Sequence, residues 1–184
     1  MGNAVRRLIM FLWLSASRVM GARLRARLRG EVVAGRRKRH DPDADSVIEP
    51  EALSLPRSEA PLVSVIIPTY GQVQFTLRCL ASIQAHEPAA AIEVIVIDDA
   101  FAGPETACLS RISGIHLVRN ETNLGFIRTC NAAAGMARGT FLLFLNNDTL
   151  VLPGWLDRMI EVFETRPDAG IVGSKLLGED GTLR

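Results

Sequence analysis

The sequence predicts an α/β fold, a mostly parallel sheet with helices on both faces. Short apolar runs recur between residues 62 and 184, stretches with helical spacing separate them, and proline or glycine marks several boundaries. Strands buried on both faces of a parallel sheet are continuous apolar runs, whereas half-exposed strands alternate. Strands that alternate with helices are typical of a parallel sheet covered on both faces.

Four apolar runs are predicted to be strands, and a fifth begins near the end of the sequence. The first is rich in β-branched residues and ends at Pro68. The second and fourth are also continuous apolar runs, and the third is shorter. The expected strands cover residues 62–67, 92–97, 115–118 and 140–145, with a further one from Ile171.

Three segments with helical spacing separate these strands. The first covers residues 75–84, and the second, residues 124–137, is rich in small side chains and stops before Gly139. The third lies between Pro153 and Pro167. Its apolar face consists of Trp155, Met159, Val162 and Phe163.

Composition fits one packed domain with a tail. The chain has 184 residues, 48% of them hydrophobic, which is enough for a sizeable core. Its three cysteines are an odd number without C-x-x-C spacing. This argues against a disulfide framework or a zinc site and is typical of a reducing compartment. We therefore expect a cytoplasmic protein.

The formal net charge of +1 hides two segments of opposite charge. Residues 1–40 carry eleven basic residues and one acidic residue, a formal charge of +10, so the remainder carries −9. We expect residues 1–40 to form a basic, partly amphipathic N-terminal extension. Met20, Leu24 and Leu28 recur there at four-residue spacing among arginines, which indicates an amphipathic helix.

The N-terminal extension has two readings of equal weight. In the first, it contacts the inner face of the membrane peripherally. In the second, it is a solvated extension or an upstream stretch that a mistaken start codon has added to the sequence. Its apolar run at residues 8–14 is far shorter than the roughly 20 residues that span a bilayer, and a signal peptide is not favoured. Nucleic acid is not expected as a partner, because the arginines are not interleaved with aromatic residues and belong to no recognised binding motif. Residues 41–61, acidic and containing proline, are expected to be a linker to the domain at residues 62–184.

Polar side chains stand where three of the expected strands end. Such ends meet at one edge of a parallel sheet, where ligands bind. There Tyr70 can stack on a base, an aspartate can accept hydrogen bonds from a base or ribose, and Asp148 can hold a cation that neutralises a pyrophosphate. Each group has an alternative reading as a turn or a helix cap, but together they predict a nucleoside-diphosphate site. The residues are Pro68, Thr69, Tyr70, Asp98, Asp99, Asn146, Asn147 and Asp148.

Other nucleotide and nucleophile motifs are missing from the sequence. There is no G-x-x-x-x-G-K-[ST], no G-x-G-x-x-G after the first strand, and no serine or cysteine in a nucleophile elbow. The sequence therefore does not support a P-loop ATPase or a dinucleotide-dependent oxidoreductase.

The motifs together resemble those of family 2 glycosyltransferases, inverting enzymes of GT-A fold that use nucleotide-sugar donors. The resemblance covers residues 62–184 and implies the donor-binding part of a GT-A domain, truncated at its C-terminus. Its end is similar to the rhamnosyltransferase-like branch. The matching segments are residues 63–70, 93–99, 123–126 with Asn131, 137–139, 144–149, and 172–177 with Gly181.

The resemblance implies roles for residues on the nucleoside side of the site. The segment from Pro68 to Tyr70 would line the base pocket, and Asp99 would contact the base or ribose with Asp98 beside it. Asn123 and Gly125 would belong to a loop near the nucleotide. The sequence Asp98-Asp99-Ala100-Phe101 departs from the usual Asp-Asp-x-Ser pattern.

On the diphosphate side, Asn146-Asn147-Asp148 stands where the family has its D-x-D metal motif. Asp148 would bind the divalent cation, Mn²⁺ or Mg²⁺, and Asn146 replaces the first aspartate while keeping an oxygen ligand.

The activity implied is transfer of a sugar from a nucleotide-diphosphate donor to a glycan or lipid-linked acceptor, in cell-surface polysaccharide or glycan synthesis. In the family the catalytic base belongs to a later acceptor-binding segment, so the catalytic residue is unknown here. The alternative is a catalytically incomplete nucleotide-binding remnant, or a membrane-associated interaction protein. A nucleotidyltransferase is less favoured, because no glycine-rich basic loop opens the domain.

Overall fold

The computed structural model of the chain describes residues 7–10, 48–178 and 182. The chain divides into two compact units, and the larger contains residues 7–10 and 48–174. The expected amphipathic basic helix lies outside the described residues, so membrane contact through it stays a prediction. None of the described helices is long and apolar enough to cross a membrane.

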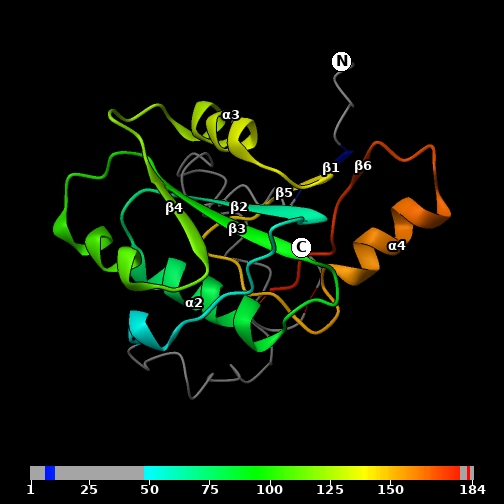
Figure 1. Cartoon of the computed structure of the whole chain (residues 1–184), viewed down its shortest axis with the longest axis horizontal. Coiled ribbons are helices and arrows are strands. Elements are labelled where there is room, and N and C mark those ends of the chain that lie inside the picture. The colour runs from blue at the N-terminus through cyan, green and yellow to red at the C-terminus, as the bar shows by residue number, and fades with distance from the viewer. Residues whose placement is uncertain (1–6, 11–47, 179–181, 183–184) are drawn as a thin grey trace, which may run out of the picture. The chain divides into compact units, whose positions relative to one another are not determined.

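Within the described residues, six strands form one parallel sheet in the order β4-β3-β2-β5-β1-β6 (Figure 1). This confirms the predicted α/β class and its parallel sheet. All seven residues of β3 are buried, which explains the continuous apolar run from Val94 to Ile97 between Glu93 and Asp98. The strands are β1 (Arg7–Met10), β2 (Val63–Thr69), β3 (Ile92–Asp98), β4 (Ile115–Arg119), β5 (Phe141–Phe144) and β6 (Ile171–Val172).

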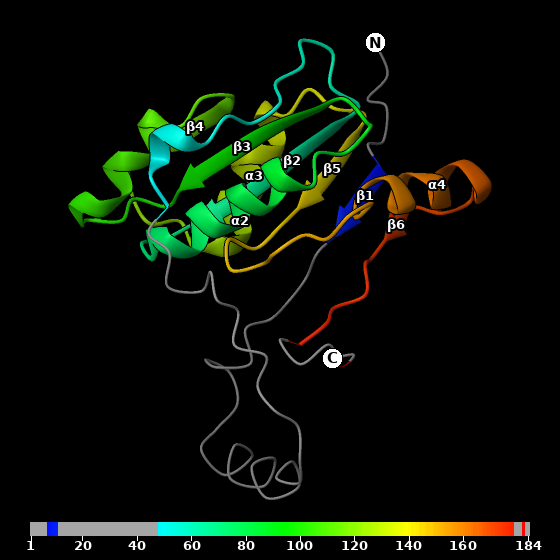
Figure 2. The ribbon, with the colours of Figure 1, turned by 90° about the horizontal axis from the view of Figure 1, so that it is seen from below.

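The helices α2 (Val73–Ala85) and α3 (Phe126–Met136) cover opposite faces of this sheet, as expected (Figure 1 and Figure 2). Helix α4 (Asp157–Thr165) packs beside β6, and its Phe163 ring stacks on Phe141 with centroids 4.9 Å apart. A buried cluster joins the sheet to α3. Its members are Ile66, Ile95, Ile97, Ala133, Ala137 and Leu142.

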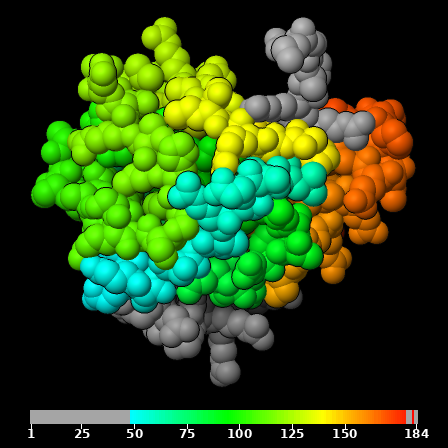
Figure 3. All heavy atoms as spheres, in the orientation of Figure 1, coloured from blue at the N-terminus to red at the C-terminus, as the bar shows by residue number. Residues whose placement is uncertain are grey.

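Two segments outside the expected domain also belong to the larger unit. Strand β1 comes from the expected N-terminal extension and pairs with both β5 and β6. Residues 48–61, expected as a linker, include the short 3-10 helix η1 (Pro50–Ala52) and lie against the surface formed by later residues (Figure 3, cyan on green). There Leu53 and Leu55 are only 4% exposed. The proline and acidic residues of this stretch led to the linker prediction, although two of its leucines are buried in the domain.

The register sets where the strands end. Thr69 pairs with Asp98, Asp98 pairs with Arg119, and Ile66 pairs with Phe144. The residues that follow β2, β3, β4 and β5 therefore emerge together, and we call this side of the sheet the carboxyl edge. A second 3-10 helix, η2 (Pro104–Arg111), follows β3 and was not anticipated from the sequence.

Candidate functional site

Thr69, the last residue of β2, connects three segments at the carboxyl edge. Its carbonyl accepts the Asp99 N–H at 2.9 Å, directly after β3. Its hydroxyl oxygen lies 3.0 Å from the Thr76 hydroxyl in α2 and 3.4 Å from the Asn147 side-chain nitrogen after β5. The structure therefore brings together predicted site residues from β2, β3 and β5.

The Asn147 side chain begins a directed chain of hydrogen bonds. Its amide nitrogen donates to the Thr76 hydroxyl oxygen at 3.1 Å, and the Thr69 hydroxyl donates to the Gly71 carbonyl at 3.2 Å. Each threonine has one hydroxyl proton, so the Thr76 hydroxyl donates to Thr69. Because the Asn147 side-chain nitrogen points to the two threonines, its side-chain oxygen can accept a hydrogen bond from a ligand or bind a metal ion.

The Asp99 carboxylate holds the loop that precedes α3. It is 6% exposed and accepts the backbone N–H groups of Leu124 at 2.8 Å and Gly125 at 2.9 Å, and the Asn120 side-chain nitrogen at 2.8 Å. Burial by itself would raise the pKa of Asp99, but these bonds outweigh it and the pKa lies below its ordinary value. Asp99 is therefore an ionised anchor for this loop.

The anchored loop contains two further predicted residues. The Asn123 side-chain oxygen accepts the Gly125 N–H at 3.1 Å, and Gly125 has a φ of +76° at the start of α3, a conformation that favours glycine. Asn120, the first residue after β4, was not predicted as a site residue. The rule that a polar residue directly after a strand faces this edge would have found it.

Asp98 has a different role from its neighbour. It is buried, one carboxylate oxygen accepts the Phe101 N–H at 3.1 Å, and the other lies 3.7 Å from Arg119. The alternative reading of the two aspartates as a helix cap does not hold, because η2 begins after Gly103 without a side-chain capping bond. Both Asp98 oxygens face protein groups, which makes it a turn-forming residue.

Tyr70 follows β2 directly and is 51% exposed. Its ring meets the Phe101 ring edge to face, with centroids 5.2 Å apart and planes at 89°. Pro68, two residues earlier, pairs with Ile97 within the sheet. The arrangement leaves much of the tyrosine ring open to a ligand at the carboxyl edge.

Asp148 is exposed as a residue, yet partial burial of its carboxylate raises its pKa. Its charge adds to burial in raising the pKa of the Cys79 thiol on α2, which places Asp148 on the α2 side of the carboxyl edge. The Cys79 thiol also lies 3.7 Å from the Asn146 carbonyl.

The residues around Asp148 offer too few ligands to bind a cation unless a bound ligand supplies further oxygen atoms. In the described part of the chain no three histidine, cysteine or acidic side chains cluster as a metal site would require. Asp148 offers one carboxylate, and Asn147 offers its side-chain oxygen. Mg²⁺ and similar ions often bind through one or two carboxylates plus substrate phosphates, which is the donor set that this edge can complete.

The sequence comparison decides the family. The profile described as Glycosyl transferase family 2 matches residues 64–184. The chain belongs to this family.

Proteins similar to this chain include two that are named for polysaccharide synthesis. The O-antigen biosynthesis protein RfbC of Myxococcus xanthus is 34% identical over 128 residues, which are 67% of this chain and 10% of that protein. The succinoglycan biosynthesis protein ExoO of Rhizobium meliloti is 31% identical over 105 residues, 56% and 30% of the two chains. An uncharacterized glycosyltransferase of Haemophilus influenzae is 30% identical over 122 residues, 63% and 37%. The chain thus matches little more than a third, at most, of these relatives.

Solved structures confirm the GT-A fold of this family 2 chain. TarS 1-349 of S. aureus, also solved in complex with UDP-GlcNAc, has a TM-score of 0.51 at 24% identity, covering 57% of this chain and 33% of that one. The mannosyltransferase PcManGT of Pyrobaculum calidifontis, in complex with GDP-Man and Mn²⁺, has a TM-score of 0.51 at 22% identity, covering 60% and 34%. At these identities the likeness concerns the fold alone.

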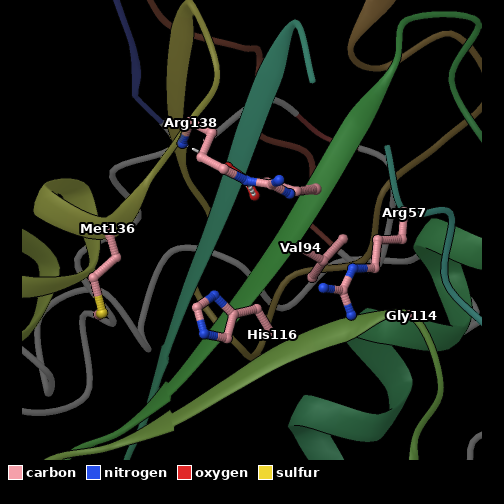
Figure 4. Close-up of a pocket in the computed structure, with 7 residues that line it drawn as sticks. Arg57, Val94, Gly114, His116, Met136 and Arg138 are labelled. Atoms are coloured by element: carbon pink, nitrogen blue, oxygen red, sulfur yellow. Dashed lines mark hydrogen bonds and ion pairs between the residues drawn. The ribbon is translucent and has the colours of Figure 1, made fainter. Parts of the chain in front are cut away.

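A pocket of about 150 Å³ lies elsewhere on the family 2 domain, toward the amino ends of the strands. Figure 4 shows Arg57, His116 and Arg138 around it, from three separate segments. The Arg138 guanidinium is paired with Glu93 at 2.9 Å and with Glu59 at 3.5 Å. These pairs balance its charge and clamp the turn before β5, so we assign the pocket a structural role.

Proposed function

We propose that this chain is the donor-binding part of a glycosyltransferase that transfers a sugar from a nucleoside diphosphate to an acceptor hydroxyl with inversion. The observation that carries the proposal is the meeting of Thr69, Asp99 and Asn147 through hydrogen bonds at the carboxyl edge. Open α/β sheets hold their ligands at this edge. Membership of family 2 supports the reaction class.

Each group has a part in holding the donor. The exposed Tyr70 ring stacks on the base, and the loop fixed by Asp99 borders the nucleoside. The oxygens of Asn147 and Asp148 face the diphosphate and its cation. When bound, a divalent cation supplies positive charge that stabilises the departing diphosphate.

The acceptor is proposed as a glycan or a lipid-linked sugar in polysaccharide synthesis. The names of the relatives RfbC and ExoO support this class. The reaction requires a general base to remove the proton of the acceptor hydroxyl. No residue of this chain is assigned that role.

Calorimetric titration of the chain with UDP, dTDP and GDP, each with and without Mn²⁺, tests the proposal. We expect saturable binding of at least one nucleotide and tighter binding with Mn²⁺. Weak binding that is equal for all three and for inorganic pyrophosphate would indicate a phosphate patch rather than a nucleotide site. No binding of any of them would refute the proposal.

The alternative, a nucleotide-binding remnant without transfer, is favoured by one feature. The motif offers a single carboxylate, Asp148, where a D-x-D motif has two. The two functions differ in turnover. Slow release of free sugar from UDP-GlcNAc or GDP-Man in the presence of Mn²⁺ would favour the transferase, and tight binding with the donor left intact would favour the remnant.

A further inference from the structure

We propose that Phe101 is a positioning residue that holds the Tyr70 ring in the orientation in which it stacks on the donor's base. This inference rests on the proposed function, because it deepens the role of Tyr70 at the same site. It gives a role to a residue that stands where the family pattern usually has serine.

The first step is the contact between the two rings. Their centroids lie 5.2 Å apart and their planes are nearly perpendicular, the favourable edge-to-face arrangement of aromatic pairs. Tyr70 is the first residue beyond β2 and is half exposed, so the sheet alone does not fix its side chain. Among the described residues, Phe101 is the aromatic partner of Tyr70.

The second step is that the backbone of Phe101 is itself fixed. Its N–H donates to Asp98 at 3.1 Å, and its carbonyl accepts an Arg119 guanidinium N–H at 2.6 Å. The preceding residue, Ala100, has a φ of +59°, which is uncommon for a residue with a side chain. Backbone strain of this kind concentrates at functional sites and persists where the surroundings impose it.

The third step concerns the space around the Phe101 ring. A Cβ added at Gly71 would lie 2.8 Å from a ring carbon of Phe101, so the ring packs directly on that glycine backbone. Gly71 itself has a φ of +64° and follows Tyr70. The ring therefore occupies a slot beside the turn that carries Tyr70, and a small side chain at position 101 would leave this slot empty.

The fourth step separates this pair from ordinary core packing. Phe101 is half-buried and Tyr70 is half exposed, whereas the aliphatic core behind them is closed to solvent. Phe101 lies two residues beyond Asp99, whose carboxylate holds the loop before α3. A ring held ready for stacking loses less freedom when the base binds, and this improves affinity for the nucleoside but not for the diphosphate.

The test uses the fact that Tyr70 is the only tyrosine of the chain. Ring-labelled tyrosine therefore gives a single set of NMR signals. We expect Phe101→Leu to move these signals in the free protein, because the ring current of Phe101 is lost. We also expect the Kd for the nucleotide bound most tightly among UDP, dTDP and GDP to rise about threefold to tenfold, the range that an aromatic pair supports.

Two controls make the test specific. Phe75→Leu alters an exposed phenylalanine of α2 outside the aromatic pair and should leave both the tyrosine signals and the Kd unchanged. The affinity for Mn²⁺-pyrophosphate should be equal in the wild-type chain and in Phe101→Leu. Phe101→Met fills the slot without a ring and should behave as Phe101→Leu does. It replaces the leucine variant in the test if that variant fails to fold.

Failure of this inference can be told from failure of the proposed function. If the wild-type chain binds a nucleotide and both position-101 variants bind it equally well, Phe101 has no positioning role while the donor site stands. If the tyrosine signals do not move, the same conclusion follows. If the wild-type chain binds none of the three nucleotides, the donor site and this inference both fail.

Discussion

The Asn147 side-chain nitrogen donates to the Thr76 hydroxyl at 3.1 Å, and this bond ties the segment after β5 to the first turn of α2. Thr76 has no exposed surface, so water cannot replace the hydroxyl there. The same α2 carries Cys79, and burial together with the nearby charge of Asp148 raises the pKa of its thiol. The position of the Asn147 side-chain oxygen, which we propose to face the diphosphate, therefore depends on a buried threonine in α2.

Thr76→Val tests this dependence. Valine keeps the shape but removes the hydroxyl, which leaves the Asn147 amide without its shorter acceptor. We expect the free energy of unfolding to fall by about 1–3 kcal/mol and Mn²⁺-dependent nucleotide binding to weaken. Urea unfolding and calorimetry measure the two effects. Thr165→Val, which alters an exposed threonine of α4, is the control and should leave binding unchanged.

Asp148→Asn should reduce the part of nucleotide binding that depends on metal. The substitution keeps an oxygen but removes the negative charge that attracts the cation. We expect the gain in affinity on adding Mn²⁺ to shrink about tenfold or more, since even outer-shell changes at metal sites reach that size. Affinity without metal should hold or improve, because repulsion of the diphosphate is lost.

Glu164→Gln provides the matched control for Asp148→Asn. Glu164 is an exposed acid on α4, whereas the nearer Asp157 accepts the Ala89 N–H at 3.1 Å and so has a structural bond to lose. Equal effects of the two charge-removing substitutions on Mn²⁺ dependence would show that Asp148 is not the metal ligand.

The sequence was sufficient to predict that polar residues from the ends of several strands gather at the carboxyl edge, although it did not single out Asn120. Continuous apolar runs fix parallel strands, so the polar residues that end them must emerge together. The rule does not separate neighbours, because successive side chains diverge where a strand ends. Asp98 and Asp99 look equivalent in the sequence, yet the first forms the turn to Phe101 and the second holds the loop before Gly125.

Other features had no local signal to read. The role of Thr76 depends on a side chain 71 residues away, and Phe101 meets Tyr70 only because of a turn with positive φ at Ala100. Strand β1 was missed because three apolar residues beside an arginine in a basic segment do not identify their partner strands. Its pairing with β5 joins residues far apart in the chain.

Gly139→Ala should destabilise the fold at the opposite end of the sheet. A Cβ at this position would lie 2.5 Å from the Ser64 backbone nitrogen, which cannot move without shifting β2. Overpacking of this kind costs about 1–3 kcal/mol.

Gly135→Ala is the matched control, because a Cβ added at Gly135 would have nothing within 4 Å and alanine favours the helix. We expect it to raise the free energy of unfolding by about 0.5–1 kcal/mol. Equal losses in both variants would contradict the predicted contact.

The Glu93 carboxylate should make the fold sensitive to acid. Burial alone would raise its pKa, but hydrogen bonds from the Ser64 hydroxyl at 2.6 Å and from the Arg138 backbone and guanidinium outweigh burial and lower the pKa from 4.5. A lowered pKa in the folded state contributes stability above pH 4.5 that is lost as the pH falls through the folded-state value. We therefore expect the wild-type chain to lose stability relative to Glu93→Gln as the pH falls below 4.5. Urea unfolding at several pH values should show the advantage of the wild-type chain over Glu93→Gln shrinking across that range. A constant advantage would mean that Glu93 stabilises the turn by packing rather than by its charge.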